Sequence, residues 1–366
     1  MTYRKSDFIF IASIAILLAF GLLMLFSASS SESYNIYKDS YFLIKRQLFL
    51  GVLPGGILFV IFSRLDFNIW QKLSKPLFIF CVLLLVLVLL PGFRADFGAA
   101  KSWFSFFGLS FQPSELAKFG LVCFLATFLA PLTREDFFNW KKSFLPFLAV
   151  LGLIGFLLMK QPDLGTFMIL FFIAMSMYFI AGGKITHLVS IFTVSIASIV
   201  GLIFVNPLRF NRLISFLNSK QDVLGISYHI NQALLTIGSG GFWGLGWGHS
   251  RQKFQFLPEA SSDSIFAIIG EELGFLFLLA LLALFGFIFW RGLKIAETAP
   301  NRFGKLLVTG IMVWFISQTF INIASMTALL PLTGVPLPLV SHGGSAMAIL
   351  LAALGIVASV SRKVKE

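Results

Sequence analysis

Long apolar stretches separated by short polar segments make up most of the chain. A helix needs about 20 mostly apolar residues to cross a bilayer core of about 30 Å, and about ten stretches come near that length. We expect one spanning helix in each of the ranges Phe8 to Phe26, Gln47 to Phe62, Pro76 to Leu90, Ser114 to Pro131, Phe144 to Leu158, Leu164 to Ala181, Thr186 to Val205, Ser264 to Trp290, Leu306 to Leu329 and Gly343 to Val360. The pattern predicts an all-α, polytopic membrane protein in which residues 1–366 form a single transmembrane domain.

The positions of the basic residues predict how these helices are oriented, because cytoplasmic segments near helix ends carry an excess of Lys and Arg. With the N-terminus inside, 16 of the 28 basic residues fall in the shorter, cytoplasmic segments: Arg4, Lys5, Arg64, Lys72, Lys75, Arg134, Lys141, Lys142, Lys184, Arg291, Lys294, Arg302, Lys305, Arg362, Lys363 and Lys365. We therefore place the N- and C-termini in the cytoplasm and a large extracytoplasmic loop at about residues 206–263.

Composition agrees with a membrane protein and removes several other classes. The chain is 58% hydrophobic and 12% charged, whereas soluble domains are about 45–50% apolar and about 25% charged. The net charge of +12 does not indicate a nucleic-acid partner, because the basic residues are scattered between apolar stretches and never form a run of about five or six. Cys81 and Cys123 lie inside apolar stretches, so neither a disulfide framework nor a cysteine metal site is predicted.

Two carboxylates, Glu259 and Asp263, close the large outer loop directly before the eighth span. An Asp at this position can simply cap the helix that follows, because its side chain accepts hydrogen bonds from the first backbone N–H groups. The same loop carries Arg251 and Lys253, however, and a carboxylate beside cations suits sugar transfer from a phosphate leaving group. Capping and catalysis both remain open for Asp263.

Charged residues inside the predicted spans are scarce. Glu115 and Lys118 are three residues apart on one helix, so they share a face and can pair. Intramembrane charges usually face a protein interior or a water-filled cavity, and both a functional cavity and a structural ion pair remain open. Asp163 precedes an outer helix start, where capping and function again compete. For Glu271 and Glu272 we favour a packing or relay role.

Two outer segments are rich in helix-breaking residues. Segment 237–250 contains six glycines, which favour either a phosphate cradle or a tight buried turn. Segment 330–345 contains three prolines and three glycines, so it must be buried in protein or line a cavity. Its Ser341, His342 and Ser345 can hydrogen-bond a ligand, although a lone histidine is more often structural.

Ordered motifs then resemble the SEDS family of cell-wall proteins (FtsW, RodA, SpoVE). They are FQPSELAK (111–118), QPDLGT (161–166), IGSGG (237–241), LPEASSD (257–263), GEELG (270–274) and GVPLPLVSHGGS (334–345). Segments 250–254 and 263–267 look more like the FtsW branch, whereas segment 335–340 is similar to RodA, and we favour FtsW. The chain departs from the family at His342, Ala346, Lys101 to Ser102 and His229.

The resemblance implies a ten-helix peptidoglycan glycosyltransferase of the bacterial inner membrane that polymerises lipid II into glycan strands. Expected partners are the lipid bilayer, a class B penicillin-binding protein, and other divisome or elongasome membrane proteins. Asp263 matches the family's catalytic aspartate, Glu115, Lys118 and Asp163 match other positions implicated in the family's activity, and Arg212 matches a loop arginine.

The mechanism we expect is an inverting transfer in which Asp263 acts as general base and undecaprenyl pyrophosphate leaves. Candidate groups for the diphosphate are Arg212, Arg251, Lys253 and Lys101, or a divalent cation, Mg²⁺ or Mn²⁺, whose ligands the sequence does not identify. Two rival functions remain: a flippase or transporter of lipid-linked precursors, and a noncatalytic scaffold for a transpeptidase.

Overall fold

The computed structural model describes residues 6–90, 102–106, 109–205, 228–254 and 256–363. Each predicted span coincides with a helix. The long helical segments are α1 (Phe8–Tyr37), the continuous unit α2 (Phe42–Gln47), η1 (Leu48–Val52) and α3 (Leu53–Arg64), then α4 (Ile69–Leu87), α5 (Pro113–Leu129), α7 (Phe144–Lys160), α8 (Leu164–Ile180), α9 (Ile185–Val205), α12 (Ile265–Glu297), α13 (Arg302–Met326) and α14 (Gly344–Ser361). Two shorter helices, α6 (Arg134–Phe138) and α11 (Tyr228–Ser239), lie in the predicted loops.

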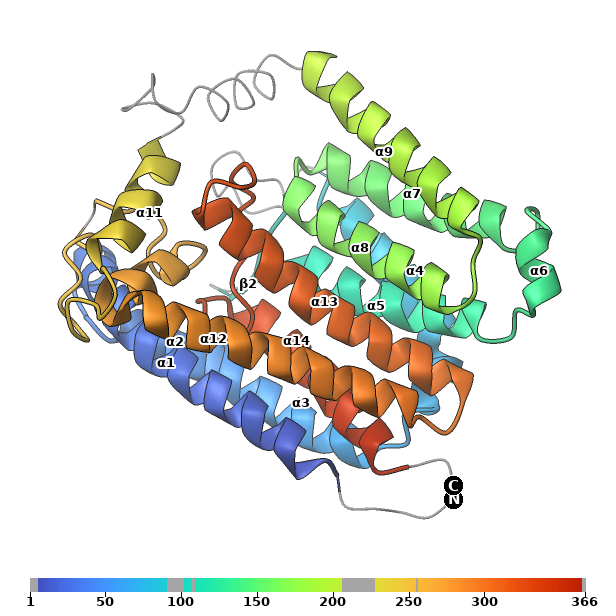
Figure 1. Cartoon of the computed structure of the whole chain (residues 1–366), viewed down its shortest axis with the longest axis horizontal. Helices are drawn as coiled ribbons and strands as arrows, with labels where there is room; N and C mark the ends of the chain where they lie inside the picture. Colours follow the sequence, from blue (N-terminus) through green and yellow to red (C-terminus); the bar gives the residue numbers. More distant parts are fainter. Residues whose placement is uncertain (1–5, 91–101, 107–108, 206–227, 255, 364–366) are drawn as a thin grey trace.

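The lengths of these helices agree with a multi-pass membrane protein. In the described part of the chain, 6 helical segments are long and apolar enough to cross a membrane by length and composition. Helices α5, α7 and α8 each have 17 residues, which is about the lower limit for a spanning helix. Figure 1 shows that the long helices run roughly alongside one another as one bundle.

Both chain ends lie at the same end of the bundle, as the topology prediction requires (Figure 1). Two ion pairs join predicted cytoplasmic segments there: Arg291 Nη2 lies 2.8 Å from Asp7 Oδ2, and Lys363 Nζ lies 2.6 Å from Asp66 Oδ2. Helix α11 lies at the opposite end, beside the first residues of α12. That opposite end is the outer side of the predicted topology.

Helix α13 forms the centre of the bundle. It packs against α12, α8, α5 and α14. Of the residues in its 18-residue apolar stretch, 83% are buried. Gly310 lets two neighbours approach closely, because a Cβ atom there would lie 2.7 Å from Met177 Sδ and 2.7 Å from Val122 Cγ1. Small residues permit such contacts between spanning helices.

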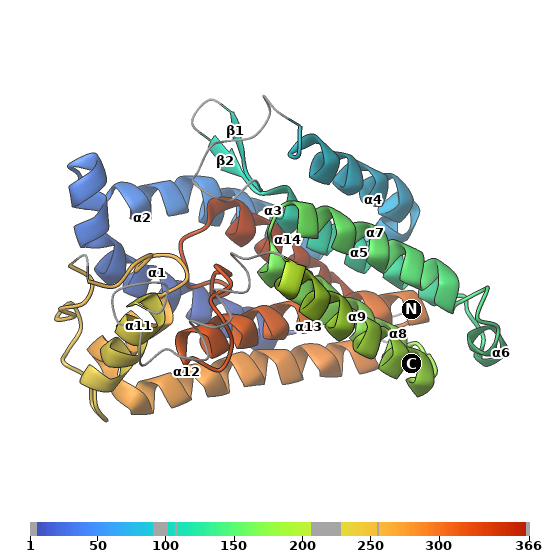
Figure 2. The same cartoon turned by 90° about the horizontal axis from the view of Figure 1, so that it is seen from above.

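One short β-hairpin interrupts the helical architecture. Strand β1 (Phe104–Phe106) pairs antiparallel with β2 (Leu109–Phe111), with Phe104 opposite Phe111. Figure 2 shows the hairpin and α4 along one edge of the molecule and α12 along the other, with α13 and α14 between them. The all-α prediction is confirmed apart from this hairpin, which leads directly into α5.

Candidate active site

A cavity of about 760 Å³ is lined by the segments that come directly before α5, α8, α12 and α14. The outer end of α3 also lines it. Of the residues proposed from the sequence, those that line it are Asp163, Glu259, Asp263, His342 and Ser345. Segments far apart in the sequence therefore bring three carboxylates, one imidazole and one hydroxyl to a single space.

Asp263 lies at the cavity wall with only 7% of its surface exposed. Ser264, not Asp263, occupies the N-cap position of α12, and no side chain makes a capping hydrogen bond there. Asn322 on α13 holds the main chain, because its Nδ2 donates to the Asp263 carbonyl oxygen at 2.8 Å. Within the described part of the chain, the buried Oδ1 of Asp263 has no hydrogen-bond partner. Capping therefore does not explain this carboxylate.

The environment of Asp263 makes it a stronger base than an ordinary carboxylate. Burial and, next, the neighbouring Glu259 carboxylate raise the pKa of Asp263 from 3.8 to about 7. Both influences disfavour the charged form. A general base works best when its pKa lies near the operating pH, so this carboxyl group is suited to proton transfer near neutrality.

Asp163 combines the two roles that compete in the sequence. Its Oδ1 accepts a hydrogen bond from the Thr166 backbone N–H at 3.0 Å, which caps α8. Its Oδ2 lies 3.4 Å from both Gln112 Nε2 and Ser114 Oγ, and Asp163 also lines the cavity. The cap fixes the carboxylate while leaving one oxygen on the cavity side.

Glu115 and Lys118 form an ion pair and do not line the cavity. Lys118 Nζ lies 2.8 Å from Glu115 Oε1 and donates to Gln318 Oε1 at 2.8 Å. Both residues are buried in α5. The intramembrane pair is therefore internal, and Gln318 connects it to the cavity wall, because Gln318 Nε2 donates to the Pro336 carbonyl oxygen at 2.9 Å.

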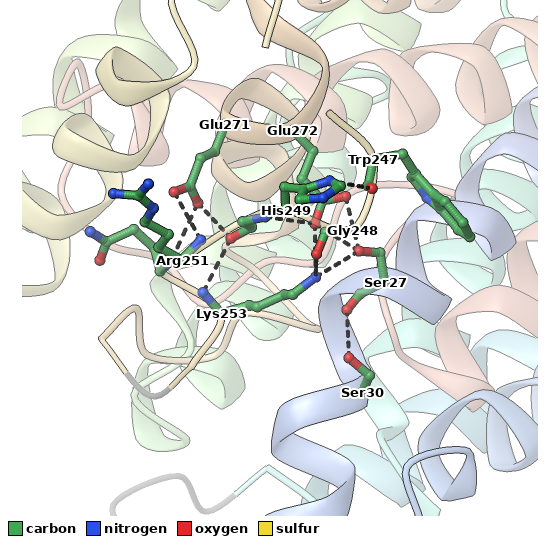
Figure 3. A network of polar contacts seen from close by, with 11 residues as sticks. Ser27, Ser30, Trp247, Gly248, His249, Arg251, Lys253, Glu271 and Glu272 are labelled. Carbon is green, nitrogen blue, oxygen red and sulfur yellow. Dashed lines mark hydrogen bonds and ion pairs between the residues drawn. The ribbon is translucent and has the colours of Figure 1, made fainter. Parts of the chain in front are cut away.

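Lys253 is part of a different polar cluster, drawn in Figure 3. Its ammonium lies 3.0 Å from Glu272 Oε1 and donates to the Gly248 carbonyl oxygen at 2.7 Å and to Ser27 Oγ at 3.1 Å. An ammonium has three donors, and these contacts use all of them. Lys253 is thus placed in the protein interior, joining the outer loop to α1 and α12, rather than at the cavity.

Glu271 holds the same loop through its backbone. Its carboxylate accepts hydrogen bonds from the N–H groups of Arg251 at 3.1 Å and Gln252 at 3.4 Å. The Arg251 side chain is exposed and is not among the residues that line the cavity. This geometry agrees with the packing role predicted for Glu271 and Glu272.

The glycine-rich segment forms a tight turn against a break in α12, and the turn itself is largely exposed. Gly274 interrupts that helix with φ 81° and ψ 177°. The N–H groups of Leu245 and Gly246 donate to the carbonyl oxygens of Glu271 and Glu272, each at 2.9 Å. A Cβ at Gly244 would lie 2.3 Å from the Glu272 carbonyl oxygen. These N–H groups are used within the protein, which favours a tight turn over the phosphate cradle, but the burial predicted for this turn is wrong because Phe242, Trp243 and Trp247 are exposed.

The segment before α14 contributes three of the predicted residues in different ways. Ser341 is internal, because its Oγ accepts from the Leu337 N–H at 2.8 Å. His342 lines the cavity, and its backbone N–H donates to the Ser261 carbonyl oxygen at 2.9 Å. Burial and the nearby Arg46 guanidinium lower the pKa of His342 to about 4, so its ring is neutral at pH 7. Ser345 lines the cavity at the start of α14.

Arg46 is a cavity residue that the sequence analysis missed. It lies on α2, lines the cavity and donates from Nη2 to Ser110 Oγ at 3.2 Å. Its position at the outer end of the second predicted span was the available signal. Two other candidate cations, Arg212 and Lys101, lie outside the described residues.

A divalent cation in the cavity would need several protein ligands close together. Among the described residues, no group of three or more His, Cys, Asp or Glu side chains is arranged to hold a metal ion. We therefore assign no ligands to Mg²⁺ or Mn²⁺, and the cation stays a prediction.

Fold and site define a multi-pass membrane protein with a carboxylate-rich cavity at its outer end. The sequence matches the model of the family described as Cell cycle protein (FtsW, RodA and SpoVE) over residues 7–366. It is 38% identical over 365 residues to stage V sporulation protein E of Bacillus subtilis (strain 168), with 99% of each chain covered. The chain belongs to the FtsW/RodA/SpoVE family.

Further relatives agree with this membership. The chain is 34% identical to a probable peptidoglycan glycosyltransferase FtsW of Geobacter sp. (strain M18), covering 98% of this chain and 97% of the relative. It also superposes on a chain of a peptidoglycan synthase complex whose structure concerns the coordination of polymerization and crosslinking. The TM-score is 0.81 at 26% identity, and 98% of both chains is covered. The rod shape determining protein RodA of Thermus thermophilus gives a TM-score of 0.70 at 28% identity, covering 98% of this chain and 97% of that one.

Proposed function

We propose that the chain is a peptidoglycan glycosyltransferase that polymerises lipid II at the outer face of the bacterial cytoplasmic membrane. The observation that carries the proposal is the buried carboxyl group of Asp263, which shares a cavity of about 760 Å³ with the guanidinium of Arg46. Sugar transfer from a lipid diphosphate needs a base for the acceptor hydroxyl and positive charge for the departing diphosphate. The name of the Geobacter relative supports the same reaction.

Asp263 acts as the general base in this mechanism. Its carboxylate takes the proton from the 4-hydroxyl of the acceptor sugar while that oxygen bonds to the anomeric carbon of the donor. The bond from the anomeric carbon to the diphosphate oxygen breaks, and undecaprenyl pyrophosphate leaves with its electron pair. Attack from the face opposite the leaving group inverts the anomeric configuration. A positioned base contributes about 10²–10⁴ in rate.

Arg46 is placed to meet the diphosphate. A guanidinium stays charged at all relevant pH values and presents a planar set of donors that fits phosphate oxygens. Arg46 approaches the cavity from α2, whereas Asp263 approaches it from the segment before α12. The base and the cation therefore reach the same cavity from different elements.

The cavity also has an apolar side that suits a lipid-linked substrate. Leu50 and Pro54 line it from the η1–α3 unit, and Ala348 and Ile349 line it from α14. These four side chains lie beyond the polar groups along the two helices. We assign the polyprenyl chain to this side, because hydrocarbon is favourably transferred from water to apolar surroundings.

A class B penicillin-binding protein is the proposed partner, together with other divisome or elongasome membrane proteins. Support comes from the similarity to a chain of a peptidoglycan synthase complex in which polymerization and crosslinking are coordinated. A transpeptidase beside the outer end of the bundle would receive the new glycan where it emerges.

Polymerisation of purified lipid II by the Asp263→Asn variant tests the proposal. The variant keeps the shape of the side chain but lacks a base, so we expect polymer formation to fall by at least about 10²-fold. Asp136→Asn is the matched control, because Asp136 sits at the N-terminus of α6, far from the cavity. Wild-type activity in Asp263→Asn would refute the assignment.

The same preparation separates the rival functions. A flippase would move labelled lipid across sealed vesicles without forming polymer, and a scaffold would support growth with Asp263→Asn. Glu115 and Lys118, on which the flippase alternative depends, are buried and paired with each other.

A further inference from the structure

Three buried polar side chains share one face of the central helix α13. Gln318, Asn322 and Ser325 are spaced four and three residues apart, which places them in one row. Each is at most 2% exposed. We call these three residues the α13 polar row. Such groups are costly within the bilayer unless they are hydrogen-bonded, so their partners show what the row does.

All three members bond to the proline-rich segment that follows α13. Gln318 Nε2 donates to the Pro336 carbonyl oxygen at 2.9 Å, and Asn322 Nδ2 donates to that of Val335 at 2.8 Å. Ser325 Oγ lies 3.2 Å from the Pro331 carbonyl oxygen and 3.1 Å from Thr333 Oγ1, and its one hydrogen is also within reach of the Ile321 carbonyl oxygen of α13 at 2.8 Å. Segment 331–337 has no helix or strand of its own. The row therefore supplies donors to carbonyl groups of Val335 and Pro336 that regular secondary structure does not satisfy.

Asn322 also fixes the base. The same Nδ2 that donates to Val335 donates to the Asp263 carbonyl oxygen at 2.8 Å. A carboxamide nitrogen has two donor hydrogens, and these two bonds use both. One side chain thus ties the segment before α12 to the segment before α14, on two sides of the same cavity.

Gln318 connects this arrangement to the intramembrane ion pair. Its Oε1 accepts from Lys118 Nζ and from Trp314 Nε1, each at 2.8 Å. Lys118 is held in turn by Glu115. Two donors therefore fix the orientation of the Gln318 amide group through its Oε1. In this orientation its Nε2 points at the Pro336 carbonyl oxygen.

We propose that Gln318 and Asn322 are positioning residues, through which the buried Glu115–Lys118 pair holds the cavity wall and the Asp263 main chain in register. The inference rests on the proposed function for its effect on rate. It gives an ion pair that does not line the cavity a connection to the cavity wall. Misplacing a reacting group by about 1 Å can cost about 10²-fold in rate.

Amide hydrogen exchange and lipid II kinetics on the purified, full-length protein test this role together. In Gln318→Met we expect faster exchange in residues 258–264 and 333–343, and a roughly 10- to 100-fold lower kcat with KM within about threefold. Thr319→Val is the matched control: Thr319 is 2% exposed on the same helix, and its Oγ1 donates only to the Phe315 carbonyl oxygen at 2.8 Å. It should change neither readout.

Two further variants keep the proposal falsifiable. Gln318→Glu retains the acceptor for Lys118 and loses the amide donor to Pro336, so it serves if Gln318→Met does not fold, and the same exchange increase is expected. The double variant Glu115→Gln/Lys118→Met removes the charges of the ion pair. When Gln318→Met is added to it, kcat should fall no further than in the more impaired of the two parent variants. Losses that multiply would overturn the connection.

Exchange separates failure of this inference from failure of the proposed function. Unchanged protection of 258–264 and 333–343 in both Gln318 variants would refute positioning, whatever the activity. Faster exchange in a protein that makes no polymer even as wild type would support the structural role while refuting the glycosyltransferase.

Discussion

Replacing Glu259 by Gln should shift the pH dependence of polymerisation towards acid. Asp263 must be ionised to act as a base, and its pKa of about 7 predicts that the wild-type rate falls below neutral pH. Burial is the largest cause of the raised pKa and the Glu259 carboxylate is the second. Because Glu259 is the smaller cause, we expect Glu259→Gln to move the acid limb by on the order of one pH unit.

The size of the effect follows from the ionised fraction. A base of pKa 7 is about 9% ionised at pH 6, and a base of pKa 6 is about 50% ionised there. A weaker base also transfers protons more slowly, so the plateau above pH 8 should fall by roughly threefold. The two changes together predict a profile that is lower at alkaline pH and roughly twice as high at pH 6.

The assay is the initial rate of lipid II polymerisation between pH 5 and pH 9 at saturating substrate. Glu135→Gln is the control, because Glu135 is exposed on α6 at the predicted cytoplasmic end. Its profile should overlay that of the wild type. A wild-type acid limb below pH 5, or a limb that moves towards alkaline pH in Glu259→Gln, would contradict the role of this pair.

Three other outcomes are expected. Arg46→Ala should lower kcat by about 10²-fold, with partial recovery in Arg46→Lys, in the same assay. Lys253→Met leaves Glu272 as an unpaired buried charge, so Tm should fall as for a loss of about 3–5 kcal/mol, and adding Glu272→Leu should restore much of it. The folded protein binds the Asp263 proton more tightly than the unfolded chain does, so protonation of Asp263 stabilises the fold and this stabilisation is lost as pH rises through about 7. Asp263→Asn should therefore raise Tm more at pH 8 than at pH 5.

Much of the fold could be predicted because bilayer solvation acts on each span separately. An apolar stretch such as Ile265–Glu297 must be helical in lipid whatever its neighbours are. The hairpin Phe104–Phe111 could not be predicted in this way, because its pairing depends on local backbone hydrogen bonds. The topology also placed Asp163 and Asp263 at the outer side, where they became functional candidates, although their positions at helix starts were equally compatible with capping.

The cations show where sequence reasoning ends. Lys253 is close to Asp263 along the chain, which suggested the active site, but its partner Ser27 is 226 residues away. Arg46 is far from Asp263 along the chain, yet both line one cavity. Asn322 looks like one polar residue in an apolar helix until its two carbonyl partners are known. Side-chain partners chosen by packing cannot be inferred from spacing in the sequence.

The buried charges of the described chain divide into two kinds, and the division supports the assignment of Asp263. Lys118 is paired with Glu115, and Lys253 with Glu272, as expected where a lone charge would be costly. Asp263 is almost as buried, but in the described ranges no cation pairs with it, and burial raises the pKa of its carboxyl group. Burying the Asp263 carboxylate without a cation beside it costs folding free energy. Groups whose pKa is perturbed in this way cluster at functional sites.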